Sequence, residues 1–158
     1  ASHPEGGFTA INKSSNSYRK GLETKLKYNI NRYSNASISH NYIDSTEYNS
    51  TIAKQQAEVR RPRNILNINY DNIFFNKLGM NSNIFYSSKV KDTDFSSYPY
   101  ENVYMSSYFL FNTTLNYNVD SKNKVSLIFK NIFNREYSEV NGYNTPGFEV
   151  LINYRNSF

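Results

Sequence analysis

The stretch NILNINYDNIF, residues Asn64–Phe74, alternates apolar and polar side chains with a period of two. This is the repeat of a β-strand, in which successive side chains point to opposite faces of a sheet. One face would carry Leu66, Ile68, Tyr70 and Phe74, and the other Ile65, Asn67, Asn69 and Asp71. The polar face needs water or polar partners, whereas the apolar face needs protein or hydrocarbon. The stretch therefore predicts a strand that lies between two different environments.

The same alternation recurs along most of the chain. It is clear in GLETKLKYNI (residues 21–30), in YFLFNTTLNYNV (residues 108–119) and in FEVLINYRNSF (residues 148–158). In the last of these, Phe148, Val150, Ile152, Tyr154 and Phe158 share the apolar face. We predict about eight strands, over residues 6–12, 19–30, 34–44, 63–74, 78–89, 107–119, 123–132 and 147–158.

The predicted connections alternate in length. Short turns are expected at residues 31–33, 75–77 and 120–122, and long polar loops at residues 45–62, 90–106 and 133–146. Transmembrane β-barrels have short turns at one end and long loops at the other, with aromatic residues at both membrane interfaces. The 15 Tyr and 11 Phe fit this class. We therefore predict an all-β, antiparallel meander of a transmembrane barrel. For the last segment, residues 147–158, the alternative is an ordinary antiparallel edge strand.

Composition excludes several other classes of protein. The 158 residues carry a net charge of +5 and no Cys, which fits one domain without disulfides or thiol chemistry. The basic residues are scattered, so we expect no nucleic-acid binding. No apolar run approaches the roughly 18 residues of a membrane helix. The first residues, ASHPEGG, resemble no signal segment, which suggests a mature product or an internal piece.

No catalytic or metal-binding constellation is recognisable. His3 and His40 lie far apart in the sequence, and His40 is expected to face a lumen or an interface. There is no nucleophile motif and no glycine-rich phosphate loop. Asp92 and Asp94 have the alternating spacing of some Ca²⁺ loops, and Asp44 and Glu47 are expected near another rim. Ca²⁺ requires six to eight oxygen ligands, and neither pair supplies them alone. We predict no catalytic residue, no metal site and no cofactor.

The C-terminal part of the chain resembles the closing segment of TonB-dependent outer-membrane receptors. The matching residues are Asn131-Ile132-Phe133-Asn134, Tyr137, Gly142-Tyr143, Pro146-Gly147 and Phe158. In that family the terminal Phe is read by the barrel-assembly machinery, which implies the same role for Phe158. The resemblance extends to GGFTAINKSSNSYRKGLE (residues 6–23) and so covers nearly the whole chain.

One loop narrows the resemblance to the cobalamin transporters of this family. The segment DFSSYPYENVYM, residues Asp94–Met105, is similar to a loop of those proteins, as is Arg60-Arg61 before the fourth strand. The resemblance implies a corrinoid ligand, which needs flat apolar surfaces and a few hydrogen-bond donors. It implies that Arg60 and Tyr143 bind the ligand. Phe95, Tyr98 and Tyr100 are further candidates, because they are aromatic residues of the predicted long loops. Phe95 stands where the family has a tyrosine, so the hydroxyl of that contact is missing.

The family has about 22 strands and an N-terminal plug, whereas this chain supplies about eight strands and no plug. Residues 1–158 are therefore expected to form the C-terminal part of the barrel in the outer membrane of a Gram-negative bacterium. The expected partners are the corrinoid, the lipid bilayer, the remaining strands and the plug, through which alone TonB would act. Open alternatives are a siderophore or heme cargo in the same family, an autonomous eight-stranded structural or adhesive barrel, and an outer-membrane enzyme.

Overall fold

The computed structural model describes residues 16–49, 52–96 and 98–158, and its regular elements are all β-strands. In chain order they are β1 (Ser17–Asn31), β2 (Ser34–Asn49), β3 (Lys54–Ala57), β4 (Asn64–Phe74), β5 (Leu78–Ser87), β6 (Val90–Asp94), β7 (Glu101–Met105), β8 (Tyr108–Asn118), β9 (Asn123–Lys130) and β10 (Glu149–Asn156). In these described ranges no helix is long and apolar enough to cross a membrane.

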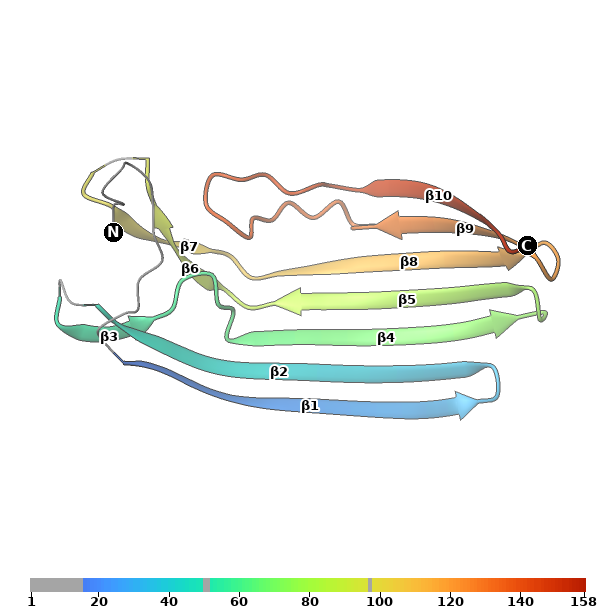
Figure 1. Ribbon diagram of the computed structural model, residues 1–158, viewed down its shortest axis with the longest axis horizontal. Coiled ribbons are helices and arrows are strands. Elements are labelled where there is room, and N and C mark those ends of the chain that lie inside the picture. Colours follow the sequence, from blue (N-terminus) through green and yellow to red (C-terminus); the bar gives the residue numbers. More distant parts are fainter. Residues whose placement is uncertain (1–15, 50–51, 97) are drawn as a thin grey trace.

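The strands form one antiparallel meander. The main sheet has the order β1-β2-β4-β5-β8-β9-β10, with β3 paired to β2, while β6 and β7 form a separate hairpin (Figure 1). Each strand of the main sheet pairs with the next one along the chain, except where β3 and the β6–β7 hairpin intervene. The predicted fold class, an all-β antiparallel sheet of about eight strands, is confirmed.

The two ends of the sheet differ as the sequence predicts. Tight turns join β1 to β2, β4 to β5 and β8 to β9 at one end, which we call the short-turn end (Figure 1). The β2–β4, β5–β8 and β9–β10 connections gather at the opposite, long-loop end (Figure 1). Six of the predicted strands match β1, β4, β5, β8, β9 and β10 within a few residues. The strand predicted over residues 6–12 lies outside the described residues.

Two predicted loops contain strands. β2 continues to Asn49 and pairs with β3, although residues 45–62 were expected to be irregular. Likewise, β6 and β7 pair within the segment 90–106, from Val90 opposite Met105 to Asp94 opposite Glu101. These strands project beyond the main sheet, so they lack the apolar stripe from which strands are recognised in a sequence.

The register places the apolar side chains on one face. Leu26, Ile38, Ile68, Ile84 and Phe111 lie directly opposite one another across five neighbouring strands. Among the described residues, the only buried hydrophobic side chains are those of Val90 and Tyr108. Ile152, by contrast, is 77% exposed. The apolar face of this sheet is therefore not covered by any described part of the chain.

The opposite face is a network of amide side chains. The Asn83 Nδ2 group donates to Asn69 Oδ1 at 2.8 Å, and Asn69 Nδ2 donates to Ser37 Oγ at 3.4 Å. A second row runs through Asn116, whose Nδ2 donates to Asn81 Oδ1 at 2.7 Å and whose Oδ1 accepts from Ser126 Oγ at 2.8 Å. Cross-strand pairs of this kind fix the register of a sheet.

His40 lies on the apolar face, in register with Thr24 and Leu66. Its Nε2 atom is 3.0 Å from Asn64 Oδ1. Of the two positions expected for His40, a lumen or an interface, the lumen would require the polar face and is therefore wrong. The reason is the two-residue period of β2, which places position 40 on the same face as Ile38 and Tyr42 whatever its polarity.

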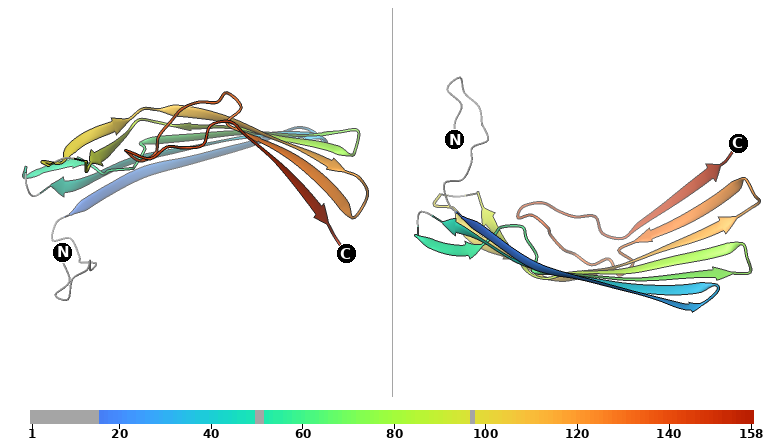
Figure 2. Two further views of the ribbon diagram at one scale, coloured as in Figure 1. Left: turned by 90° about the horizontal axis from the view of Figure 1, so that it is seen from above. Right: turned by 60° about the horizontal axis from the view of Figure 1, so that its bottom comes forward.

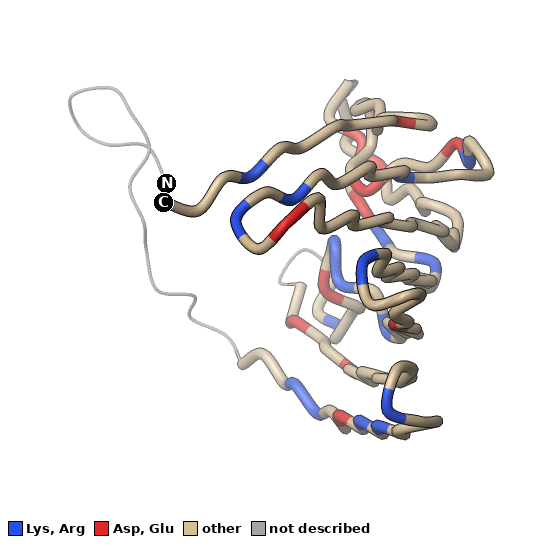
Figure 3. Tube along the Cα trace, turned by 90° about the vertical axis from the view of Figure 1, so that its right-hand side faces the viewer, with Lys and Arg blue, Asp and Glu red and all other residues tan. Residues whose placement is uncertain are grey.

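The sheet is curved and open. The strands bend along their length when the sheet is seen from above (Figure 2), and they follow an arc when it is seen from the short-turn end (Figure 3). β1 and β10 form the two edges of the sheet. The seven strands of the main meander alternate in direction, so β1 and β10 both run from the long-loop end to the short-turn end. An antiparallel barrel can close only if an odd number of further strands lies between them. The described strands thus form part of a barrel wall.

Candidate ligand-binding site at the long-loop end

Arg60, in the connection from β3 to β4, is fixed through both its backbone and its side chain. Its backbone N–H donates to Lys91 O at 2.8 Å, and its Nε donates to Asp92 Oδ1 at 2.9 Å. Its φ angle is 57°, in the left-handed region that residues other than glycine rarely adopt. Both bonds come from β6, so this strand determines where the guanidinium group lies.

Asp92 joins three connections of the long-loop end. Its Oδ1 accepts from Arg60 Nε and from its neighbour Thr93 N, and its Oδ2 accepts from Asn141 N at 2.8 Å. The carboxylate is almost fully buried, with a side-chain exposure of 1%. A buried carboxylate is tolerated only when its hydrogen bonds are made, as they are here. One side chain therefore ties the β3–β4 connection and the β9–β10 connection to the β6–β7 hairpin.

The pKa of the Asp92 carboxyl lies below its ordinary value of 3.8. Burial raises it, but the hydrogen bonds from Asn141, Thr93 and Arg60 favour the charged form and outweigh the burial. The ionised Asp92 carboxylate therefore stabilises the folded chain fully at a pH above the pKa that it has in the unfolded chain. This stabilisation is lost as the pH falls through the lower pKa of the folded state.

We expect this tie between the connections to hold at neutral pH and to weaken only below pH 3.8. Spin labels on Glu101→Cys and Asn144→Cys, in a chain without other cysteines, would report it as a broadened distance distribution. In an Asp92→Asn variant the distribution should already be broad at neutral pH and should not change in this window. A sharp distribution at all pH values in that variant would contradict the assignment.

Three of the five predicted binding residues line one hollow of about 710 Å³. Arg60 lies on one side, Phe95 belongs to the β6–β7 hairpin, and Tyr143 belongs to the β9–β10 connection. The remaining lining residues are Thr93, Asp94, Ser96, Val140, Asn141 and Gly142. The structure thus brings together side chains that are separated by more than 80 positions in the sequence.

Tyr98 and Tyr100 do not line this hollow but continue from Phe95 as a chain of aromatic rings. The Phe95 and Tyr100 ring centroids are 5.1 Å apart, and those of Tyr98 and Tyr100 are 5.7 Å apart, both in edge-to-face geometry. Tyr98 is 87% exposed and Tyr143 is 71% exposed. Exposed aromatic rings held by one another offer apolar contact area at little entropic cost.

The β9–β10 connection is shaped by the Asn131-Ile132-Phe133-Asn134 motif. Asn131 is 4% exposed; its Oδ1 accepts from Arg135 N at 2.8 Å, and its Nδ2 donates to Arg135 O at 2.9 Å. Its own backbone N–H donates to Asn112 Oδ1 at 2.9 Å. Asn134 Oδ1 accepts from Phe148 N, which closes the loop where β10 begins. The motif thus has a structural role, since it folds the loop that carries Tyr143.

Below this loop, aromatic rings cover the polar face of the sheet. The Tyr137 and Tyr108 ring centroids are 4.4 Å apart, and the Tyr108 hydroxyl donates to Glu139 Oε1 at 2.9 Å. Phe85 packs on the other side of Tyr108 at 6.0 Å. These contacts hold the β9–β10 connection, which carries Tyr143, against the sheet.

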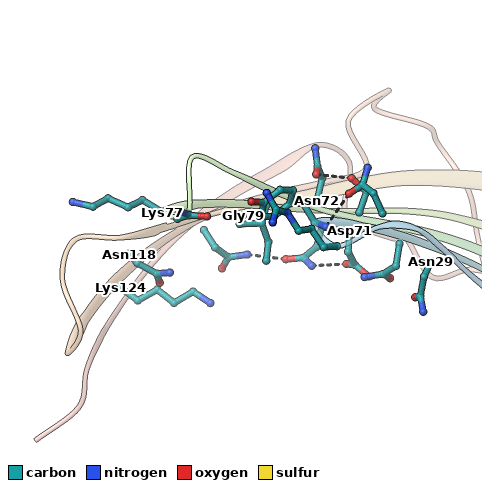
Figure 4. A pocket seen from close by; sticks show the side chains of 16 residues that line it. Asn29, Asp71, Asn72, Lys77, Gly79, Asn118 and Lys124 are labelled. Atoms are coloured by element: carbon teal, nitrogen blue, oxygen red, sulfur yellow. Dashed lines mark hydrogen bonds between the residues drawn. The ribbon is translucent and has the colours of Figure 1, made fainter.

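The short-turn end has a different character. A hollow of about 720 Å³ lies there, and amide side chains line most of it (Figure 4). Lys77, Lys124 and Asn118 lie at one end of it and Asn29 at the other, with Asp71 between them (Figure 4). The asparagine side chains of this surface offer many hydrogen-bonding groups.

Sequence reasoning missed the role of Asp92 and of Asn141. Asp92 was noted only as a weak Ca²⁺ candidate, whereas its carboxylate accepts hydrogen bonds from Arg60, Thr93 and Asn141. Within the described residues no group of three or more His, Cys, Asp or Glu side chains gathers in a way that could hold a metal ion. The partners of Asp92 lie 32 and 49 residues away, so the sequence carries no local signal of this contact.

No family model matches the chain. Solved structures do: the FpvAI–pyocin S2 complex matches with a TM-score of 0.76 and 14% identity over 91% of this chain. The ferric-catecholate import receptor Fiu from E. coli K12 matches with a TM-score of 0.74 and 12% identity over 99% of this chain. The siderophore receptor PiuA from Acinetobacter baumannii matches with a TM-score of 0.71 and 18% identity over 90% of this chain.

At these identities the likeness establishes the fold. The chain spans about a fifth of the length of these structures, namely 20%, 23% and 22%. Its fold is that of a segment of an antiparallel barrel wall.

Proposed function

We propose that this chain is a wall segment of a TonB-dependent outer-membrane receptor that takes up a large, scarce nutrient. The observation that carries the proposal is the two-faced meander: an uncovered apolar face, a hydrogen-bonded polar face and an aromatic-rich site at the long-loop end. The likeness to two receptor structures supports it. On this proposal the apolar face contacts lipid, the polar face lines the lumen, and the long-loop end is extracellular.

Such uptake is binding followed by gated passage and not an enzymatic reaction. The wall segment supplies part of the extracellular binding surface and part of the lumen. The strands that complete the barrel and the plug on which TonB acts belong to the rest of the receptor. Phe158, beyond the end of β10, remains a predicted signal for barrel assembly.

Ferric siderophores are the first candidate ligands. One matching structure is a ferric-catecholate import receptor and another is a siderophore receptor. Ferric siderophores combine flat apolar surface with anionic oxygen, which suits an arginine beside aromatic rings. A corrinoid is the second candidate, because the segment Asp94–Met105 resembles the cobalamin transporters. Its amide oxygens could accept from the same arginine.

We expect Arg60→Ala and Tyr143→Ala each to weaken ligand binding by about tenfold, because each removes a contact from the centre of the site. Equilibrium binding of a ferric catecholate and of cyanocobalamin to the complete receptor would measure this and identify the ligand. Arg63→Ala is the matched control, since Arg63 lies at the same end but pairs with Asp44 at 2.8 Å. Binding of neither probe, or equal losses in Arg60→Ala and in the control, would contradict the proposal.

A further inference from the structure

Asp92 is the only large, fully buried side chain among the residues that the structure describes. We propose that it is the positioning residue of the binding site: it holds Arg60 and the segment 140–143 in one arrangement, so that both contact the same ligand. This inference rests on the proposed function and adds the element that organises the site.

The two carboxylate oxygens of Asp92 accept hydrogen bonds from two different connections. Oδ1 accepts a hydrogen bond from Nε of Arg60 and so orients the guanidinium group. Oδ2 receives the N–H of Asn141, two residues before Tyr143. The carboxylate is anchored in β6, within a hairpin of five paired positions. Arg60 and Tyr143 are thereby fixed relative to the same strand although they come from different connections.

The geometry also specifies the class of ligand. The bond to Asp92 uses Nε of Arg60, so it leaves the two terminal guanidinium nitrogens for an acceptor in the hollow. Arg60 is about half exposed, whereas the Asp92 carboxylate is inaccessible. Asp94 also lines the hollow, so a ligand there meets one guanidinium group and one carboxylate. Phe95 and Tyr143 line the same hollow. The site therefore suits an apolar or aromatic ring system that carries an oxygen acceptor for the guanidinium group.

The test is an Asp92→Asn variant of the complete receptor. Asn has nearly the same shape, but it lacks the charge, and one of its two terminal atoms is a donor that cannot accept from Arg60 or from Asn141. Asp44→Asn is the matched control, because Asp44 also pairs with an arginine at the long-loop end but touches no residue of the hollow. Folding of both variants is checked by the gel mobility of the unheated protein.

Two readouts separate positioning from general stability. Spin labels at Glu101→Cys and Asn144→Cys report how firmly the hairpin holds the β9–β10 connection without any ligand. We expect Asp92→Asn to broaden the distribution of distances between the two labels, and Asp44→Asn to leave that distribution unchanged. We also expect Asp92→Asn to weaken binding of whichever probe binds, ferric catecholate or cyanocobalamin, by about tenfold or more. When Arg60→Ala is already present, adding Asp92→Asn should weaken binding by a clearly smaller factor, because Asp92 acts in part by holding Arg60.

A second variant covers the case in which Asp92→Asn does not fold. Arg60→Lys removes the Nε bond but leaves Asp92 bound to Asn141, so affinity should fall while the label distance stays sharp. An unchanged label distance in folded Asp92→Asn would overturn the proposal. Unchanged probe affinity in Asp92→Asn would also overturn it. The same holds if Asp92→Asn lowers the affinity by its full factor when Arg60→Ala is already present. If neither probe binds the unmodified receptor, the proposed function fails, and the label distances still decide whether Asp92 organises the loops.

Discussion

Arginine in place of Ile68 is expected to destabilise the folded barrel by about 2–4 kcal/mol, the cost of an arginine on the lipid face near the bilayer midplane. Ile68 lies in the middle of β4, directly opposite Ile38 on one neighbouring strand and Ile84 on the other. None of the described residues covers this face, so the proposed function requires hydrocarbon there. Urea unfolding of the complete receptor in lipid vesicles, followed by gel mobility, would measure the change.

Asn67→Arg is the matched control for this substitution. Asn67 precedes Ile68 on the same strand, and its side chain points to the polar face, opposite Ser39 and Phe85. An arginine there remains in the aqueous lumen, so we expect a change within about 0.5 kcal/mol. Equal losses at positions 67 and 68 would show that the two faces do not differ in their surroundings, contrary to the assignment of lipid and lumen.

Alanine in place of Asn131 is expected to destabilise the β9–β10 connection by about 2–4 kcal/mol. The side chain is buried and bonds both the N–H and the carbonyl of Arg135, and removing it leaves these backbone groups without those partners. The φ angle of Asn131 is 48°, a conformation that asparagine tolerates better than alanine. Faster proteolysis within residues 135–146 and a lower urea midpoint of the complete receptor would show the loss.

Two further variants separate the causes of this loss. Asn131→Gly accepts the left-handed backbone but lacks the side chain, so we expect it to lose slightly less stability than Asn131→Ala. Asn144→Ala changes an exposed residue of the same connection and should be nearly neutral. If Asn131→Ala were as stable as Asn144→Ala, the motif that contains Asn131 would not determine the shape of this loop.

The strands of the main sheet were predictable because each of them has one apolar and one polar face. β4, β8 and β10 show this clearly, and their predicted limits lie within two residues of the observed ones. β3, β6 and β7 were missed because they lie beyond the apolar band, where neither face of a strand has to be apolar. For His40, polarity suggested a lumen or an interface, and the strand period excludes the lumen because it places His40 on the same face as Ile38.

The binding site was predictable only in part. Family resemblance pointed to Arg60, Phe95 and Tyr143, and the structure brings these three to one hollow. Tyr98 and Tyr100 extend it through their ring contacts with Phe95. Asp92 could not be found in this way, because its role depends on connections that meet only in the folded chain. Such contacts between loops have no period and no local spacing, so only the structure shows them.

On the proposed function, this sheet is one part of a larger barrel wall. Native mass spectrometry of the chain, extracted in mild detergent from outer membranes, tests that claim. We predict a species well above the 18.4 kDa of residues 1–158, because the chain spans only about a fifth of the length of the structures that share its fold. A folded, heat-modifiable species of 18.4 kDa would contradict the account and would establish an autonomous small barrel.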